Sequence, residues 1–257
     1  MASVHFLDPC PDGRPTVLLL HGLGAGADSW TMQFPALMGR GYRPIAPDLP
    51  GFGSSPYDGR GWSIRREAEA MACLLEDLRT GPVAVVGLSM GGTIAQQIAL
   101  DFPQLTRALV LVSTFSVMRP ERLDGWLYFL RRFILVSALG LSAQARYVAG
   151  RIFPGPQNEE LRALLIASIE KADPRAYRSA MRALGLFNSM RRLNEIQIPT
   201  LVVTGKNDTT VPPVSQRKLV EGIWGARQVV IGNAGHAVTI DQPEAFNQAL
   251  LGFLEQI

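Results

Sequence analysis

Short, continuous apolar runs recur along this chain of 257 residues, and segments with helical periodicity separate most of them. Strands buried on both faces have such unbroken apolar runs, and their alternation with helices is typical of a parallel sheet. The sequence therefore predicts an α/β fold with a mostly parallel sheet and helices on both of its faces. We expect strands at 17–20, 42–46, 83–86, 108–112, 200–204 and 228–231, and helices at 63–78, 93–100, 214–222 and 243–256.

The alternation stops between residues 116 and 195, where only helical patterns broken by Gly and Pro occur. We therefore expect an all-helical insertion at 116–195, between the two parts of a core domain at 1–115 and 196–257. The insertion is also the most basic part of the chain, because it holds 13 of the 25 Lys and Arg residues.

The first predicted helix of the insertion, 124–142, combines aromatic residues with two adjacent arginines. Three interpretations of this helix are open. It packs against the core, it forms an apolar wall over a substrate pocket, or it attaches the protein to anionic lipid or an acidic carrier protein. For the pocket wall, the candidate residues of the insertion are Met118, Trp126, Phe129 and Phe133.

A serine stands between the expected strand 83–86 and the expected helix 93–100. It is the centre of the motif Gly87-Leu88-Ser89-Met90-Gly91. A strand, a sharp turn and a helix are the context in which a G-x-S-x-G motif exposes a nucleophilic serine at the end of a sheet. The glycines leave room for the turn and for close packing of helix on strand. We therefore expect Ser89 to be a nucleophile.

A serine hydroxyl is a weak nucleophile unless a base takes its proton, and histidine usually serves as that base. The chain has three histidines, His5, His21 and His236. Only His236 lies in a loop that follows a strand near the C-terminus. A single histidine can instead be a structural residue held by hydrogen bonds. The position of His236 in a loop after a strand favours the role of base.

A carboxylate that orients the base is expected between Ser89 and His236 in the chain. Asp208 is the best candidate, because it lies in the loop directly after the expected strand 200–204. Its alternative role is to shape that loop as an Asx-turn residue. Asp124 is the second candidate for the acid.

The chain resembles the α/β-hydrolase fold family over nearly its whole length. Five short segments, which follow one another in the order of that family, carry the resemblance. They are His21-Gly22-Leu23-Gly24, the run from Asp48 to Ser55, the run from Gly87 to Gly92, Gly205-Lys206-Asn207-Asp208 and Gly235-His236. The resemblance implies a catalytic triad of Ser89, Asp208 and His236.

The resemblance implies further that the backbone N–H groups of Leu23 and Met90 form an oxyanion hole, which stabilises the negative charge of the transition state. His21 and Asp48 would shape the loops at the strand ends. The segment 116–195 would be a helical cap. No metal ion or cofactor is expected for this chemistry.

The leading hypothesis is a serine hydrolase that cleaves carboxylic esters of small, mostly apolar molecules through an acyl-enzyme. Enol-lactone hydrolysis and C–C bond hydrolysis by the same fold are alternatives, although C–C hydrolases usually have an aromatic residue after the histidine and Ala237 stands here. A ligand receptor that retains the triad with little turnover is the alternative from another class.

Composition limits the partners and the compartment. The net charge of +3 and the pI near 9.1 come without an arginine-rich arm or a nucleic-acid-binding motif, so no nucleic-acid partner is expected. Cys10 and Cys73 are too few for a disulfide framework, and no export signal is visible at the N-terminus. The longest apolar stretch, 133–141, is short for a membrane span. We expect a cytoplasmic protein with a small-molecule ester as substrate; the sequence indicates no oligomeric state.

Overall fold

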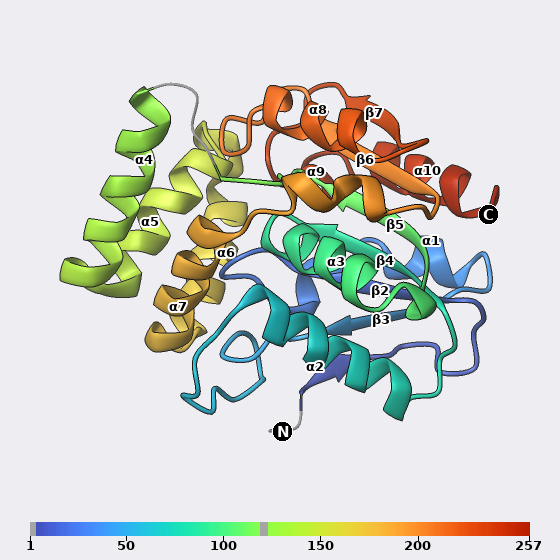
Figure 1. Cartoon of the computed structure of the whole chain (residues 1–257). Helices are drawn as coiled ribbons and strands as arrows, with labels where there is room; N and C mark the ends of the chain where they lie inside the picture. The colour runs from blue at the N-terminus through green and yellow to red at the C-terminus, as the bar shows by residue number, and fades with distance from the viewer. Residues whose placement is uncertain (1–3, 119–122) are drawn as a thin grey trace.

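A seven-stranded sheet with the strand order β1-β3-β2-β4-β5-β6-β7 forms the centre of the molecule (Figure 1). The computed structural model describes residues 4–118 and 123–257, without the side chains of residues 123–126 and 129. Neighbouring strands are parallel except β1 and β3, which are antiparallel, so the expected mostly parallel α/β sheet is confirmed. The strands are β1 (Phe6–Leu7), β2 (Thr16–Leu20), β3 (Arg43–Pro47), β4 (Val83–Leu88), β5 (Thr106–Val112), β6 (Thr200–Gly205) and β7 (Arg227–Ile231).

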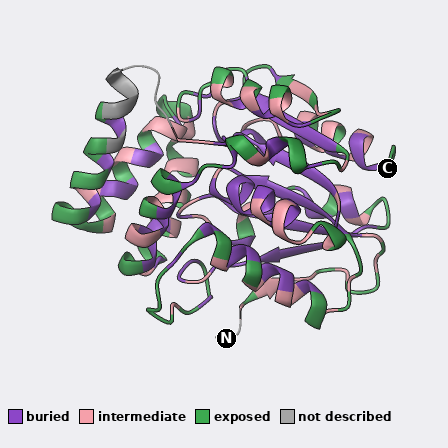
Figure 2. Cartoon of the chain, in the orientation of Figure 1, coloured by how far each residue is buried: buried purple, intermediate pink, exposed green. Residues whose placement is uncertain are grey.

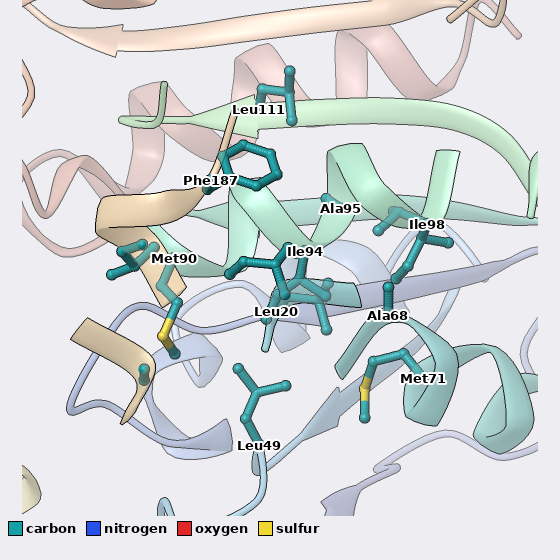
Figure 3. Packing of buried hydrophobic residues seen from close by; sticks show 14 of the residues in the cluster. Leu20, Leu49, Ala68, Met71, Met90, Ile94, Ala95, Ile98, Leu111 and Phe187 are labelled. Atoms are coloured by element: carbon teal, nitrogen blue, oxygen red, sulfur yellow. The ribbon is translucent and has the colours of Figure 1, made fainter. Parts of the chain in front are cut away.

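Helices cover both faces of this sheet, because consecutive strand side chains point to opposite sides. In β2, Leu18 and Leu20 belong to the hydrophobic cluster shared with α2 and α3, whereas Val17 and Leu19 belong to the cluster shared with α1 and α10. Figure 2 shows the strands buried between these layers, and Figure 3 shows Leu20 together with Ile94 of α3. The helices of the core are α1 (Phe34–Met38), α2 (Ile64–Asp77), α3 (Met90–Asp101), α8 (Pro213–Gly222), α9 (Val238–Asp241) and α10 (Pro243–Leu254).

In the described residues between β5 and β6, four α-helices gather at one side of the core (Figure 1, left). Asp173 connects this group to the core: its backbone N–H donates to Gly51 O at 2.8 Å. Its carboxylate also caps α7 by accepting from the N–H groups of Arg175 and Ala176 at 2.7 and 3.2 Å. The helices are α4 (Leu123–Ile134), α5 (Gly140–Ile152), α6 (Glu159–Lys171) and α7 (Pro174–Leu186), with the π-helical turn η3 (Leu135–Leu139) between α4 and α5.

The helical run Leu130–Ile152 is long and apolar enough to cross a membrane by length and composition alone, with 23 residues and a mean hydropathy of 1.3. In the fold this run is not one straight rod. The turn η3 interrupts it, Gly140 has a φ of +79°, and α5 packs along α6. Val136 and Ala145 of the run are buried in the hydrophobic core. The run Leu130–Ile152 therefore packs within the helical segment beside the sheet.

The two-residue strand β1 has no counterpart in the sequence-based prediction, because a run of that length carries no periodicity. Its pairing with β3 matches Phe6 with Pro47. The carbonyl of His5 also accepts from Asp48 N–H at 2.8 Å. This edge pairing fixes the N-terminal segment next to the loop that follows β3.

Glu67 is an exception to the apolar packing of α2. Its side chain is only 2% exposed, and its Oε2 has no hydrogen-bond partner in the described part of the chain. Burial raises the pKa of Glu67 to about 8, against a weaker opposite effect of the nearby Arg66. The folded protein therefore keeps Glu67 protonated at neutral pH, whereas the unfolded chain ionises it.

We expect Glu67→Gln to stabilise the protein at pH 8 by about 2–4 kcal/mol and to have little effect near pH 4.5. The folded-state pKa is raised, so the native protein loses stability as the pH rises from the unfolded pKa to about 8. Denaturant unfolding across this pH range measures the effect. Glu69→Gln, on the exposed face of α2 in an ion pair with Arg65, is the matched control and should change stability by less than about 0.5 kcal/mol. An equal increase in the free energy of unfolding of Glu67→Gln at both pH values would contradict the raised pKa of Glu67.

Candidate active site

Ser89 occupies a sharp turn between β4 and α3. Its φ of +54° and ψ of −111° lie outside the regions that L-residues ordinarily adopt. Two hydrogen bonds to the neighbouring strand's end hold this strained residue: Ser89 N–H donates to Val112 O at 2.8 Å, and Thr114 Oγ1 donates to Ser89 O at 2.7 Å. The turn therefore presents the serine at the carboxyl edge of the sheet, as the motif predicted.

The two glycines of the motif are required by close backbone contacts. A Cβ atom at Gly87 would overlap the carbonyl of Gly91, the second residue of α3. A Cβ atom at Gly91 would overlap the carbonyl oxygen of Leu20 at the end of β2. Only glycine at both positions lets α3 begin directly against the sheet, with the Ser89 turn between them.

His236 and Asp208 form a buried pair on adjacent strand ends. His236 lies in the loop after β7 and is 7% exposed, and Asp208 lies in the loop after β6 and is 4% exposed. The ring Nδ1 of His236 is 2.9 Å from Asp208 Oδ2. Backbone hydrogen bonds connect the two loops, because Asn207 N–H donates to Ala234 O and Lys206 N–H donates to Ile231 O. Both residues that were expected from the sequence are thus brought together.

The carboxylate of Asp208 divides its two oxygens between two tasks. Oδ1 accepts from the backbone N–H groups of Thr210 and Val211 at 2.8 and 2.9 Å, which is the loop-shaping role. Oδ2 accepts from Gln216 Nε2 at 3.2 Å and faces His236. The two interpretations of this aspartate therefore do not exclude one another.

A second carboxylate, Asp241 of α9, supports the histidine loop. Its Oδ2 accepts from Gly235 N–H at 2.7 Å, directly before His236. Burial raises the pKa of Asp241, while this hydrogen bond and the nearby His236 act in the opposite direction. Sequence reasoning missed this residue, because its spacing from the histidine has no recognisable motif.

The loop after β2 lies next to the serine. A Cβ atom at Gly22 would be 3.6 Å from Ser89 Cβ, and Leu23 lines the same cavity as Ser89. The backbone N–H of Met90 stands at the start of α3, where helix N–H groups lack partners within the helix. In the described part of the chain neither the Leu23 nor the Met90 amide donates to another protein group. Both are therefore available to an oxygen atom in the cavity.

His21 and Asp48 hold the neighbouring loops, which agrees with the loop-shaping role expected for them. Leu49 N–H donates to His21 Nε2 at 3.0 Å, so Nδ1 carries the proton and donates to Gly22 O at 2.8 Å. Burial lowers the pKa of His21, and the ring stays neutral. Asp48 accepts from the backbone N–H of Ala27 at 2.6 Å and also binds His5 Nδ1 at 2.7 Å.

A cavity of about 480 Å³ opens over these groups. Ser89, Leu23 and His236 line it from the core, and residues of α4, α5 and α6 line it from the helical segment. Most of the lining from the helices is apolar, as in Val148, Ile152 and Leu165. In the part of the chain that the structure describes, no group of three His, Cys, Asp or Glu side chains gathers as metal ligands.

The four pocket residues expected from the insertion have different outcomes. Met118 lines the cavity. The side chains of Trp126 and Phe129 lie outside the described residues. The expectation for Phe133 is corrected: its side chain is 46% exposed on α4 and does not belong to the cavity lining.

The outward position of Phe133 follows from helix geometry. Residues four apart share one face of a helix, and among the described side chains of α4 those of Tyr128 and Arg132 line the cavity. Phe133 is one position further on and is rotated away from that face. Sequence analysis missed Tyr128, Arg132 and Arg151 as lining residues; the four-residue spacing of the first two was the available signal. The side chain of Asp124, the second candidate for the acid, also lies outside the described residues.

The chain is similar to known proteins over nearly its whole length. A model of the alpha/beta hydrolase family matches residues 17–249. RutD of Variovorax paradoxus, a proposed carbamate hydrolase by its name, is 30% identical over 99% of this chain and 97% of its own length. A pimeloyl-acyl-carrier-protein methyl ester esterase of Aeromonas hydrophila is 29% identical over 93% of this chain and 95% of its own. A solved esterase of Thermogutta terrifontis with bound malate covers 98% of this chain and 93% of its own, with a TM-score of 0.86 and 27% identity.

We expect Gly91→Ala to destabilise the fold by roughly 1–3 kcal/mol, because the added methyl group overlaps the Leu20 carbonyl. The displaced turn should also slow labelling of Ser89 by a fluorophosphonate by about 100-fold. Denaturant unfolding and mass spectrometry of the labelled peptide measure the two effects. Gly150→Ala, in an open position of α5, is the control and should stabilise slightly without changing the labelling. Normal labelling and stability of Gly91→Ala would contradict the packing argument.

Proposed function

This chain belongs to the alpha/beta hydrolase family, and we propose that it hydrolyses carboxylic esters of small, mostly apolar molecules through an acyl-enzyme on Ser89. The observation that carries this proposal is the buried contact of 2.9 Å between His236 Nδ1 and Asp208 Oδ2. His236 lines the same cavity as the strained Ser89 turn. The relative from Aeromonas hydrophila is named as a methyl ester esterase, which supports esters as the class of substrate.

In the proposed reaction, His236 Nε2 takes the proton of the Ser89 hydroxyl as its oxygen attacks the ester carbonyl. Asp208 accepts the Nδ1–H of the ring, which leaves Nε2 without a proton and able to accept the one from the serine. The tetrahedral intermediate carries its negative charge on the former carbonyl oxygen, and the amides of Leu23 and Met90 would donate to it. The alcohol leaves with the proton, and His236 then activates water to release the acid.

We propose that the helical segment 116–195 acts as a cap that encloses the substrate. The cap residues in the cavity wall are mostly apolar, and pockets for small molecules are usually of this kind. A cavity of about 480 Å³ suits a short or medium acyl chain. An extended peptide would leave its backbone groups without partners there.

We expect Ser89→Ala and His236→Ala each to lower kcat for an ester by a factor of the order of 10⁴–10⁶, and the double variant to be little worse, because the residues act as one unit. Asp208→Asn should fold and lose about 10⁴ in rate, because it fixes the wrong imidazole tautomer. Steady-state kinetics with a p-nitrophenyl ester measure these rates.

Asp124→Asn is the control for the acid and should retain nearly full activity. A fully active Asp208→Asn combined with an inactive Asp124→Asn would contradict the assignment of the acid. A slow, sub-stoichiometric turnover of every ester, together with tight binding of a ligand, would identify a receptor instead of an enzyme.

We expect kcat/KM to rise about fourfold per added methylene in a series of p-nitrophenyl esters and to fall once the acyl chain exceeds the cavity. Burial of each methylene stabilises the transition state until the apolar wall is filled. The series from acetate to palmitate is measured together with a peptide, an enol-lactone and a vinylogous diketone as alternative substrates. A monotonic rise to palmitate with activation at an oil–water interface, or efficient peptide cleavage, would overturn the enclosed ester pocket.

A further inference from the structure

Arg132 of α4 is a buried cation in the wall of the active-site cavity. It is 8% exposed and lines the cavity that also contains Ser89. Its Nη2 donates to Tyr177 Oη at 3.2 Å, and its guanidinium carbon lies 5.6 Å from the centre of the Tyr128 ring. With the Gln144 amide oriented so that its oxygen faces Arg132, this oxygen accepts from Nε at 2.8 Å.

All of these partners are neutral. In the described part of the chain no Asp or Glu forms an ion pair with Arg132. Burial by itself lowers the pKa of Arg132, but the hydroxyl groups of Tyr128 and Tyr177 outweigh it, and the pKa is raised. The guanidinium is therefore charged. A buried charge without a counterion is costly, so its presence in a ligand cavity calls for a partner of opposite charge.

A second guanidinium stands on the same aromatic ring. Arg151 of α5 lines the cavity, and its guanidinium carbon lies 4.3 Å from the centre of the Tyr128 ring. Its Nη2 donates to Thr209 O at 2.6 Å, next to Asp208. Its Nε is buried and has no hydrogen-bond partner in the described residues. Two cations thus converge on one part of the cavity wall, and one of them retains a free donor.

The negative charge in the cavity lining does not offset these cations. Among the described lining residues the only carboxylate is that of Asp28, which is exposed to solvent. Water and salt screen an exposed charge strongly, whereas a buried charge such as that of Arg132 is screened much less. The cap side of the cavity is therefore electropositive, although most of its surface is apolar.

Arg132 is also fixed relative to the reacting groups. Tyr177, which accepts its hydrogen bond, packs against Gly24 in the loop after β2. Ser168 of α6 binds the same loop, because its Oγ donates to Gly24 O at 2.9 Å. Leu23, whose amide is a proposed oxyanion donor, directly precedes this glycine. The position of the cation is thus coupled to the position of the loop beside Ser89.

We propose that Arg132, together with Arg151, forms a carboxylate-binding subsite, so that the substrates are esters that carry a second, ionised carboxylate. This inference rests on the proposed ester hydrolysis and names its substrate class. A carboxylate accepts two hydrogen bonds from the planar guanidinium and supplies the counterion that the described residues do not provide. The apolar wall holds the chain between the carboxylate and the ester. Monoesters of aliphatic dicarboxylic acids have this chemistry.

The test compares the monomethyl esters of succinic to suberic acid with the matched monomethyl esters whose free acid is replaced by a carboxamide. The wild-type protein should prefer the carboxylate by about 10–100-fold in kcat/KM. Arg132→Met should reduce this preference by a similar factor, and Arg132→Lys should restore part of it. Arg131→Met is the matched control, because Arg131 is the exposed neighbour on α4 and should leave the preference intact.

The preference is a ratio measured on one preparation, so it does not depend on the fraction of a variant that folds. If Arg132→Met and Arg132→Lys lost the same factor in kcat/KM on the carboxylate and on the carboxamide esters, Arg132 would only support the cap. The same preference in Arg131→Met and Arg132→Met, or no preference in the wild-type protein, would also overturn the subsite. A Ser168→Ala variant does not change the cation and should retain the preference.

A binding measurement separates this inference from the proposed function. Calorimetry with Ser89→Ala should show binding of monomethyl adipate, weakened about 10–100-fold in Ser89→Ala/Arg132→Met. Arg132-dependent binding without turnover of any ester would retain the subsite and overturn ester hydrolysis. Turnover of neutral and anionic esters at equal rates, with no Arg132-dependent binding, would retain ester hydrolysis and overturn the subsite.

Discussion

The close approach of α3 to the sheet is the constraint on which the rest of the structure depends. Gly91 lies so near the carbonyl of Leu20 that no side chain fits between them. This contact lets the chain turn at Ser89 with a φ of +54°, directly after β4 in the middle of the sheet. The loops after β2, β6 and β7 begin at the same edge, because the carboxyl ends of parallel strands lie at one edge of the sheet. Backbone packing therefore positions Ser89 and the loops that carry Asp208 and His236.

The core and the cap contribute different chemistry to the shared cavity. The core contributes the serine turn, the buried contact between His236 and Asp208 and two backbone amides that have no acceptor among the described residues. The helices α4, α5 and α6 contribute a mostly apolar wall, and α4 and α5 each add a guanidinium group. Tyr177 connects the two parts, since it accepts from Arg132 and its ring lies 6.3 Å from that of Phe52. We infer that the reaction type is set by the core and that the choice of substrate is set by the cap.

The structure gives α4 a role in packing and in the cavity wall. It does not test the third interpretation, attachment of this helix to lipid or to a carrier protein. One face of α4, with Tyr128 and Arg132, lines the cavity, and Val136 of the following turn η3, four positions after Arg132, is buried in the core. Packing and pocket formation thus use the same face. The opposite face carries exposed apolar residues, and it is the part of the helix that the lipid or carrier-protein interpretation concerned. These residues are Leu127, Leu130, Phe133 and Ile134.

The sequence by itself determined the sheet, the Ser89 turn and the candidates Asp208 and His236, because strands, tight turns and glycine requirements are local properties of the chain. Only the tertiary structure decided which face of α4 meets the cavity. The rotation of a helix about its axis depends on partners far away in the chain, here Tyr177 and Gln144. For this reason Phe133 points to solvent while Arg132 is buried. That no described carboxylate pairs with the buried Arg132 is visible only once the distant side chains around it are in place.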